Sequence, residues 1–264
     1  MTLIIGILCK DGVVMASDSA ASFDKEGVPT IGQQEVRKIH KLSDALLYSS
    51  MGAIGMSQVI ADELKKSGEQ KEFDNIPTPE GVMHTIGMKL MQILGPYLQV
   101  ANLIRPLIGA ASQSLCKSLV AMPVQHVPCL FSFDYNGAPE RATEELPFVA
   151  MGLGQPIADP FLALLKRLLW QNSQPTLAEG RLAATWTIDH VRLTNPGGVG
   201  GKIQLATLSG NPGKPPTISL FSEQDVQEHL EQIRAAEQAL IRELRTPASG
   251  EGINTPPTPG TENS

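Results

Sequence analysis

Residues 2–19 read TLIIGILCKDGVVMASDS, and this stretch has the pattern of a β-hairpin. The run from Leu3 to Cys9 is short and continuously apolar, which is typical of a strand buried on both faces. The turn is expected at residues 10–12, because Asp-Gly supplies the backbone conformations that a tight hairpin needs. Residues 13–17 then return as a second strand, which brings Asp18 back beside the start of the first strand.

The residue at the start of this hairpin carries chemistry of its own. Removal of Met1, which is generally efficient before a small residue, would leave Thr2 with both a hydroxyl and a free α-amine. Such an amine has an unperturbed pKa of about 7.7–8.0 and is an adjacent base that activates the hydroxyl as a nucleophile. This chemistry requires a rigid chain end, which a strand beginning at Leu3 would provide. From this stretch alone, Thr2 as an incidental early residue remains an open alternative.

Three further residues favour the chemical interpretation of Thr2. Asp18 is expected near the Thr2 end of the hairpin, and together with Lys38 it would form a charged cluster. The lysine would stabilise an alkoxide and tune proton transfer, and the aspartate would keep that lysine charged. Gly52 follows a strand and offers a backbone N–H to an oxyanion with no side chain in the way.

The rest of the chain mixes strand and helix patterns. Strands are expected at residues 36–42, 45–51, 127–133, 148–151, 202–208 and 216–220. Helices are expected at residues 57–66, from 77 to 94, at 161–170, at 177–193 and from Ser222 onward. Polar residues 22–35 predict a loop, and residues 95–118 fit one broken helix or two. This order suggests stacked sheets with helices outside.

Composition excludes several classes of protein. The 264 residues carry a net charge of −6, which gives no electrostatic footprint for nucleic acid or anionic lipid. The start lacks the pattern of a signal peptide, and no apolar run is long enough for a membrane helix. Three cysteines without a C-x-x-C pair suit a reduced compartment, so we expect a soluble cytoplasmic protein. The five histidines show no metal spacing, and the glycine-rich segment 197–202 does not fit a P-loop, so no cofactor is expected.

Four segments of the sequence resemble a known family. The pattern T-x-x-x-G-[IV]-x-x-K-D-G-V-V-[ML]-A-[SA]-D-S in residues 2–19 looks like the start of a proteasome β-subunit. V-x-K-I-x-K-L at 36–42, S-x-M-G-A-x-G at 49–55 and F-V-A-M-G-L-G-Q-P at 148–156 are similar to later motifs of that family. The lack of a propeptide resembles the bacterial members, and the long C-terminal helix looks most like the proteasome homologue of beta-proteobacteria.

The resemblance implies a fold and a division of the chain. The fold would be α+β, a four-layer αββα sandwich of the N-terminal-nucleophile hydrolase type. The hydrolase domain would cover residues 2–221, a C-terminal helix residues 222–245, and a disordered tail residues 246–264.

The resemblance also implies the site. Thr2 would be nucleophile and base, Lys38 and Asp18 its charged partners, and Gly52 the oxyanion donor. The pocket for the substrate side chain would be lined by Ala21, Val36, His40, Ser50, Ile54 and Gln58. Two departures concern the proton network: Leu153 stands where the family usually has a serine, and the segment around Asn195 replaces a D-x-x-S-G pattern.

The expected activity is that of a threonine endopeptidase acting on peptides or unfolded proteins. Its subunits would form two stacked homo-oligomeric rings that confine the sites; an ATPase unfoldase as partner is left open. Two alternatives also stay open: a ring-forming scaffold or binding protein with weak or lost peptidase activity, and a small-molecule amidase on the same fold.

Overall fold

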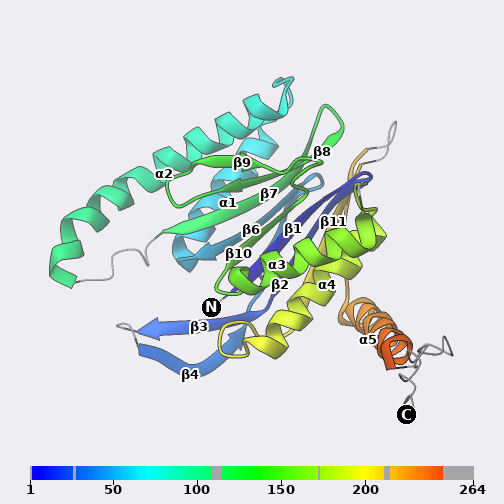
Figure 1. Cartoon of the computed structure of the whole chain (residues 1–264). Helices are drawn as coiled ribbons and strands as arrows, with labels where there is room; N and C mark the ends of the chain where they lie inside the picture. Colours follow the sequence, from blue (N-terminus) through cyan, green and yellow to red (C-terminus); the bar gives the residue numbers. More distant parts are fainter. Residues whose placement is uncertain (1, 26–27, 109–114, 172, 211–214, 246–264) are drawn as a thin grey trace, which may run out of the picture.

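The computed structural model describes residues 2–25, 28–108, 115–171, 173–210 and 215–245. Two five-stranded antiparallel sheets lie face to face in it (Figure 1). The first sheet has the order β10-β1-β2-β11-β12. Its strands are β1 (Leu3–Cys9), β2 (Gly12–Asp18), β10 (Phe148–Gly152), β11 (Ile203–Ser209) and β12 (Thr217–Leu220).

The second sheet has the order β5-β6-β7-β8-β9. Its strands are β5 (Ile39–Ser43), β6 (Leu46–Gly52), β7 (Cys116–Val124), β8 (Val127–Phe133) and β9 (Pro139–Arg141). A separate two-stranded hairpin of β3 (Ala20–Lys25) and β4 (Val28–Glu35) connects the first sheet to the second along the chain (Figure 1).

Helices cover the outer face of each sheet (Figure 1). The second sheet carries α1 (Ile54–Glu69) and α2 (Pro79–Ile108). The first sheet carries α3 (Gln155–Leu165), which continues into a π-helical turn (Lys166–Trp170), and α4 (Leu177–Thr194). The last helix, α5 (Glu223–Arg245), packs on α4 as far as Glu237, which accepts from the Trp186 Nε1–H, and ends in exposed residues (Figure 1). The expected four-layer αββα sandwich is therefore confirmed.

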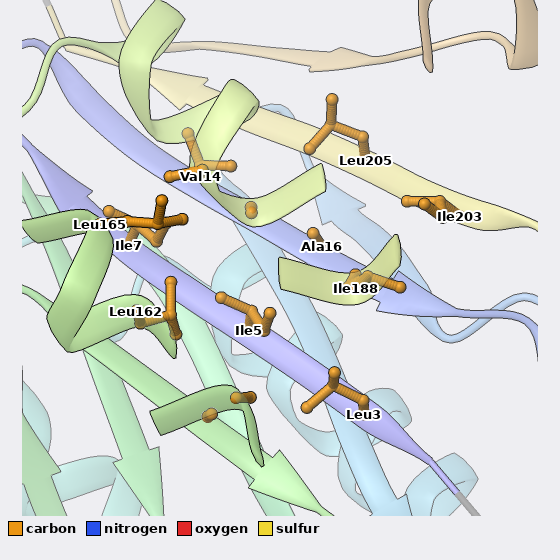
Figure 2. Close-up of a cluster of buried hydrophobic side chains, with 14 of the residues drawn as sticks. Leu3, Ile5, Ile7, Val14, Ala16, Leu162, Leu165, Ile188, Ile203 and Leu205 are labelled. Carbon is orange, nitrogen blue, oxygen red and sulfur yellow. The ribbon is translucent and has the colours of Figure 1, made fainter. Parts of the chain in front are cut away.

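Burial of β1 on both faces explains why the first strand is apolar throughout. Leu3, Ile5 and Ile7 point toward the helices that cover the first sheet, where they meet Leu162 of α3 and Ile188 of α4 (Figure 2). The intervening Ile4 belongs to the apolar layer between the two sheets. The hairpin turn falls at residues 10 and 11, as predicted, and Cys9 pairs with Gly12.

Three expectations about the elements were wrong or incomplete. The predicted loop at 22–35 lies largely in β3 and β4, which pair with each other through backbone groups and need no apolar side chains for that pairing. The segment left open at 95–118 holds the second half of the continuous helix α2 and the start of β7, with residues 109–114 outside the described part. The strand predicted from residue 36 begins only at Ile39. The predicted tail, residues 246–264, lies outside the described residues.

Candidate active site

Thr2 lies directly before β1, and strands on both sides of β1 hold that end of the chain. Leu3 pairs with Gly152 of β10, and Ile4 pairs with Ser17 of β2. The Leu3 N–H donates to Asp18 Oδ1 over 2.9 Å. The hairpin turn thus returns Asp18 to the beginning of β1, as the sequence predicts.

Lys38 reaches the same point from the other sheet. Its ammonium donates to Asp18 Oδ1 over 2.7 Å, to the Ala20 carbonyl over 2.7 Å and to Thr2 Oγ1 over 3.1 Å. The side chain is almost fully buried, and that burial lowers the pKa of Lys38, while the neighbouring Asp18 carboxylate opposes the shift. The arrangement therefore places a buried ammonium on the threonine hydroxyl and a carboxylate behind it.

Asp18 is fully buried, and both backbone N–H groups and the Lys38 ammonium donate hydrogen bonds to its carboxylate. In addition to the Leu3 N–H and the lysine, the Gly200 N–H donates to Asp18 Oδ2 over 3.2 Å. The next residue fixes the same loop, because Ser19 Oγ accepts from the Lys202 N–H over 2.7 Å. Such compensation is what a buried carboxylate needs, since an unpaired buried charge is strongly destabilising.

Two glycines with left-handed backbone angles flank Thr2. Gly52 ends β6 with φ +119°, and a Cβ there would lie 2.2 Å from the Leu115 carbonyl. Gly152 ends β10 with φ +112°, and a Cβ there would lie 2.0 Å from the Thr2 carbonyl oxygen. Only glycine fits either position without moving the neighbouring backbone, which is that of Leu115 at Gly52 and that of Thr2 at Gly152.

A pocket of about 370 Å³ opens beside Thr2. All six residues expected to line a substrate pocket contribute to its wall, together with Thr2, Lys38, Gly52 and three residues that the sequence did not single out. The expected six are Ala21, Val36, His40, Ser50, Ile54 and Gln58, and the additional three are Arg37, Met51 and Ser57. Each of the additional three is a chain neighbour of an expected lining residue, which is the signal that would have found them.

The pocket wall is mixed in character. The hydroxyls of Ser50 and Ser57 are hydrogen-bonded to each other over 2.5 Å, and apolar side chains lie beside them. Burial, with a smaller contribution from the positive charge of Arg37, lowers the pKa of His40. The imidazole is therefore neutral at pH 7 in this environment.

The two departures from the expected motifs lie at the ends of helices α3 and α4. Leu153 occupies the turn between Gly152 and Gly154 before α3, and its side chain is 58% exposed. Asn195 caps the C-terminus of α4, and its carbonyl accepts from the Gly198 and Val199 N–H groups. Asn195 thus shapes the loop that presents the Gly200 N–H to Asp18.

Across the described ranges, His, Cys, Asp and Glu side chains form no cluster of three or more that could ligate a metal. No helix in the described part of the chain combines the length and apolarity needed to cross a bilayer.

Comparison with known proteins gives the family. A sequence model of the proteasome subunit family matches residues 2–168. The proteasome subunit beta of Methanococcus aeolicus is 24% identical over 230 residues, 86% of this chain and 90% of that protein. The proteasome subunit beta of Ferroglobus placidus is 26% identical over 157 residues, 60% of this chain, and that of Archaeoglobus profundus is equally similar. The chain spans less than two thirds of these last two relatives, 65% and 63% of their lengths.

Solved structures share the fold. Anbu (ancestral beta-subunit) from Yersinia bercovieri superposes with a TM-score of 0.66 at 18% identity, covering 95% of this chain and all of that one. Anbu from Pseudomonas aeruginosa, described as a helical assembly, gives a TM-score of 0.67 at 18% identity with the same coverage. The finer resemblance to the beta-proteobacterial homologue is not tested by these matches and stays a prediction. With a family match over more than half of its length and this fold, the chain belongs to the proteasome subunit family.

Proposed function

We propose that this protein is a threonine peptidase whose nucleophile is Thr2, exposed as the N-terminal residue by removal of Met1. The observation that carries the proposal is the 3.1 Å hydrogen bond from the Lys38 ammonium to Thr2 Oγ1 beside a side-chain pocket. Membership of the proteasome subunit family supports hydrolase chemistry at this position. No cofactor enters the proposed chemistry.

The reaction runs as acyl transfer to the threonine. The Thr2 amine takes the proton from Oγ while Oγ attacks the substrate carbonyl, and the Gly52 N–H stabilises the oxyanion. The protonated amine then gives its proton to the leaving amine as the peptide bond breaks, which leaves an ester on Thr2. Water attacks that ester with the same amine as base, which releases the acid and restores the hydroxyl.

Lys38 and Asp18 act on the nucleophile without forming a covalent bond. The positive charge 3.1 Å from Oγ1 lowers the cost of developing negative charge on that oxygen. Asp18 keeps the lysine protonated against the effect of burial. The pocket beside Thr2 would then receive the substrate side chain that precedes the scissile bond.

We further propose that the active protein is a homo-oligomer that confines these sites. The Pseudomonas aeruginosa relative is described as a helical assembly, and two stacked rings are the arrangement that the sequence resemblance implies. Exposed apolar residues on α2 and on the C-terminal part of α5 supply surface for contacts between subunits. Among them are Val100, Leu103, Leu240 and Leu244. Sedimentation of the purified protein tests this directly, and a monomer at micromolar concentration would contradict it.

The peptidase proposal is tested by intact mass and by active-site labelling. The mass should be lower by one methionine, and a threonine-directed epoxyketone should add once per chain and block hydrolysis of a fluorogenic peptide. Thr2→Ala should assemble but neither label nor hydrolyse. Retention of Met1, or a Thr2→Ala protein that cleaves as fast as wild type, would contradict the mechanism.

Leu153 favours one competing function, a scaffold or binding protein with decayed activity, because it replaces a polar group expected near the threonine amine. Labelling without turnover of a peptide panel would support that function. Turnover of small amides but not peptides would instead identify a small-molecule amidase.

A further inference from the structure

Lys38 belongs to a short connection that has no strand partner of its own. Residues 36–38 lie between β4 and β5 and outside both ladders, although the Lys38 ammonium must stay within hydrogen-bond distance of Thr2 Oγ1. We propose that Gln204 is a positioning residue that fixes the backbone of Lys38 and thereby aims its ammonium at Thr2. Its catalytic consequence rests on the proposed peptidase function, whereas its geometric consequence does not.

The side-chain amide of Gln204 hydrogen-bonds three backbone groups of this connection. Gln204 Oε1 accepts from the Lys38 N–H over 2.9 Å and from the Ile39 N–H over 3.4 Å. Gln204 Nε2 donates to the Val36 carbonyl over 2.5 Å. The amide thus takes the place of the strand that these residues lack. Its orientation is fixed, because the peptide N–H can only donate and the carbonyl can only accept.

The position of Gln204 in the fold connects the two halves of the site. Gln204 lies in β11 and pairs with Ser17, next to Asp18, while its neighbour Ile203 pairs with Asp18 itself. The first sheet therefore carries Asp18, Gln204 and the strand that follows Thr2. Lys38, in contrast, leads into β5 of the second sheet. The amide spans the gap between the sheets at the point where the threonine and the lysine must meet.

A second side chain binds the other backbone group of Lys38. Ser49 Oγ of β6 donates to the Lys38 carbonyl over 2.8 Å. The Lys38 N–H is thus bound from the first sheet and its carbonyl from the second. Loss of the Ser49 bond leaves the Lys38 backbone tied to the sheet that carries Thr2. Loss of Gln204 removes the bonds of the Lys38 N–H and the Val36 carbonyl to that sheet and leaves the bond from the Val36 N–H to the Ser19 carbonyl in place.

The test compares Gln204→Met with wild type in the assembled protein. Methionine fills a similar volume, but its sulfur is only a weak acceptor for the Lys38 N–H and it has no donor for the Val36 carbonyl. We expect kcat for a fluorogenic peptide to fall by about tenfold to a hundredfold, because a misplacement of about 1 Å costs on that order. KM should change less than kcat, because only Val36, Arg37 and Lys38 of the described pocket wall belong to this connection.

Gln204→Glu adds a pH dependence of the rate that a purely structural role of Gln204 would not produce. A carboxylate accepts from the Lys38 N–H but cannot donate to the Val36 carbonyl, whereas a protonated acid does both. The rate of this variant relative to wild type should therefore rise as the pH falls from 8 toward 5. A ratio that is flat with pH would contradict the proposal.

Two further measurements keep the outcomes separate. Leu208→Val, a core change on the same face of β11, serves as the matched control for loss of packing and should keep kcat within about twofold. Crystal structures of wild type and Gln204→Met report the distance from Lys38 Nζ to Thr2 Oγ. An increase beyond hydrogen-bond range supports the positioning role even if wild type proves inactive, which would sink only the peptidase function. An unchanged distance together with an unchanged kcat would overturn the inference.

Discussion

The ammonium of Lys38 donates a hydrogen bond to Thr2 Oγ1 over 3.1 Å, although the two residues precede strands of different sheets. The lysine is buried and paired with Asp18, so its charge depends on a balance between desolvation and one carboxylate. Under the proposed function, the protonation state of Lys38 controls the nucleophile, and this balance can be measured through pH.

Asp18→Asn should shift the alkaline limit of activity to lower pH. Burial already lowers the pKa of Lys38 below that of an ordinary lysine, and the Asp18 charge is what opposes it. Removing that charge lowers the pKa of Lys38 further, so the ammonium is lost earlier as the pH rises. The measurement is the pH profile of epoxyketone labelling at Thr2 for both proteins.

The same variant should be less stable at neutral pH. Leaving a buried cation without its partner costs about 3–5 kcal/mol. Between the lowered folded pKa of Lys38 and its unfolded value of about 10.4, the unfolded chain binds more protons, so stability should rise with pH in that window. Asp44→Asn is the control, because Asp44 pairs with Lys41 at an exposed site and should leave both profiles unchanged. Identical pH profiles for Asp18→Asn and wild type would refute the assigned role.

Gly152→Ala should slow the labelling of Thr2, although Gly152 itself does not line the substrate pocket. The added Cβ would lie 2.0 Å from the Thr2 carbonyl oxygen, and the backbone has φ +112°, so the strand must move where it pairs with Leu3. We expect a loss of about a hundredfold in labelling rate, as for other misplacements near 1 Å. Gly95→Ala is the matched control, because nothing lies within 4 Å of its added Cβ in α2. A Gly152→Ala protein that labels at the wild-type rate would show that Thr2 tolerates displacement.

The pocket beside Thr2 predicts discrimination against basic side chains before the scissile bond. Among its described lining residues there is no aspartate or glutamate, whereas Arg37 and Lys38 both contribute. We expect kcat/KM for leucine at that position to exceed that for arginine by at least about tenfold, since facing like charges cost several kcal/mol. Arg37→Glu should narrow or reverse the ratio, and Arg245→Glu, exposed at the end of α5, should not change it. Equal rates for arginine and leucine peptides would contradict this assignment of the pocket.

The sequence predicts the first hairpin well because every signal there is local. An apolar run, an Asp-Gly turn and a second run fix β1, β2 and the position of Asp18. β7 was missed for the opposite reason. Its residues Cys116–Val124 follow a long apolar region, and a continuous apolar run does not distinguish a strand from a buried helix. The hairpin of β3 and β4 was missed because its strands are polar and pair only with each other.

The residues of the candidate site also divide into those that the sequence predicts and those that it does not. Thr2, Asp18, Lys38 and Gly52 are carried by motifs, and the structure brings all four together. Gln204 carries no motif, because a single glutamine inside a strand has no sequence signature. Its contacts depend on the register of β11 against β2 and on the approach of the two sheets, which are tertiary properties.

The docking of α5 on α4 should weaken below neutral pH through His229. Both ring nitrogens of His229 are buried and have no hydrogen-bond partner in the described part of the chain. Burial, followed by the facing Arg181 of α4, lowers the pKa of His229, against smaller opposing effects of Asp225 and Glu228 on α5 itself. The histidine is therefore neutral in the docked helix, whereas an undocked helix takes up a proton near pH 6.5. The stability of docking is thus constant above that pH and falls as the pH drops through it.

Amide hydrogen exchange across residues 223–245 at pH 7.5 and 5.5, corrected for intrinsic rates, measures this effect. Exchange in α5 should become faster at the lower pH, whereas exchange in the buried strand β1 should not. His229→Phe removes the titrating group while keeping an aromatic ring, and should abolish the pH difference in α5. His84→Gln, at an exposed position of α2, is the control that should preserve it. A pH difference that persists in His229→Phe would place its origin in another group.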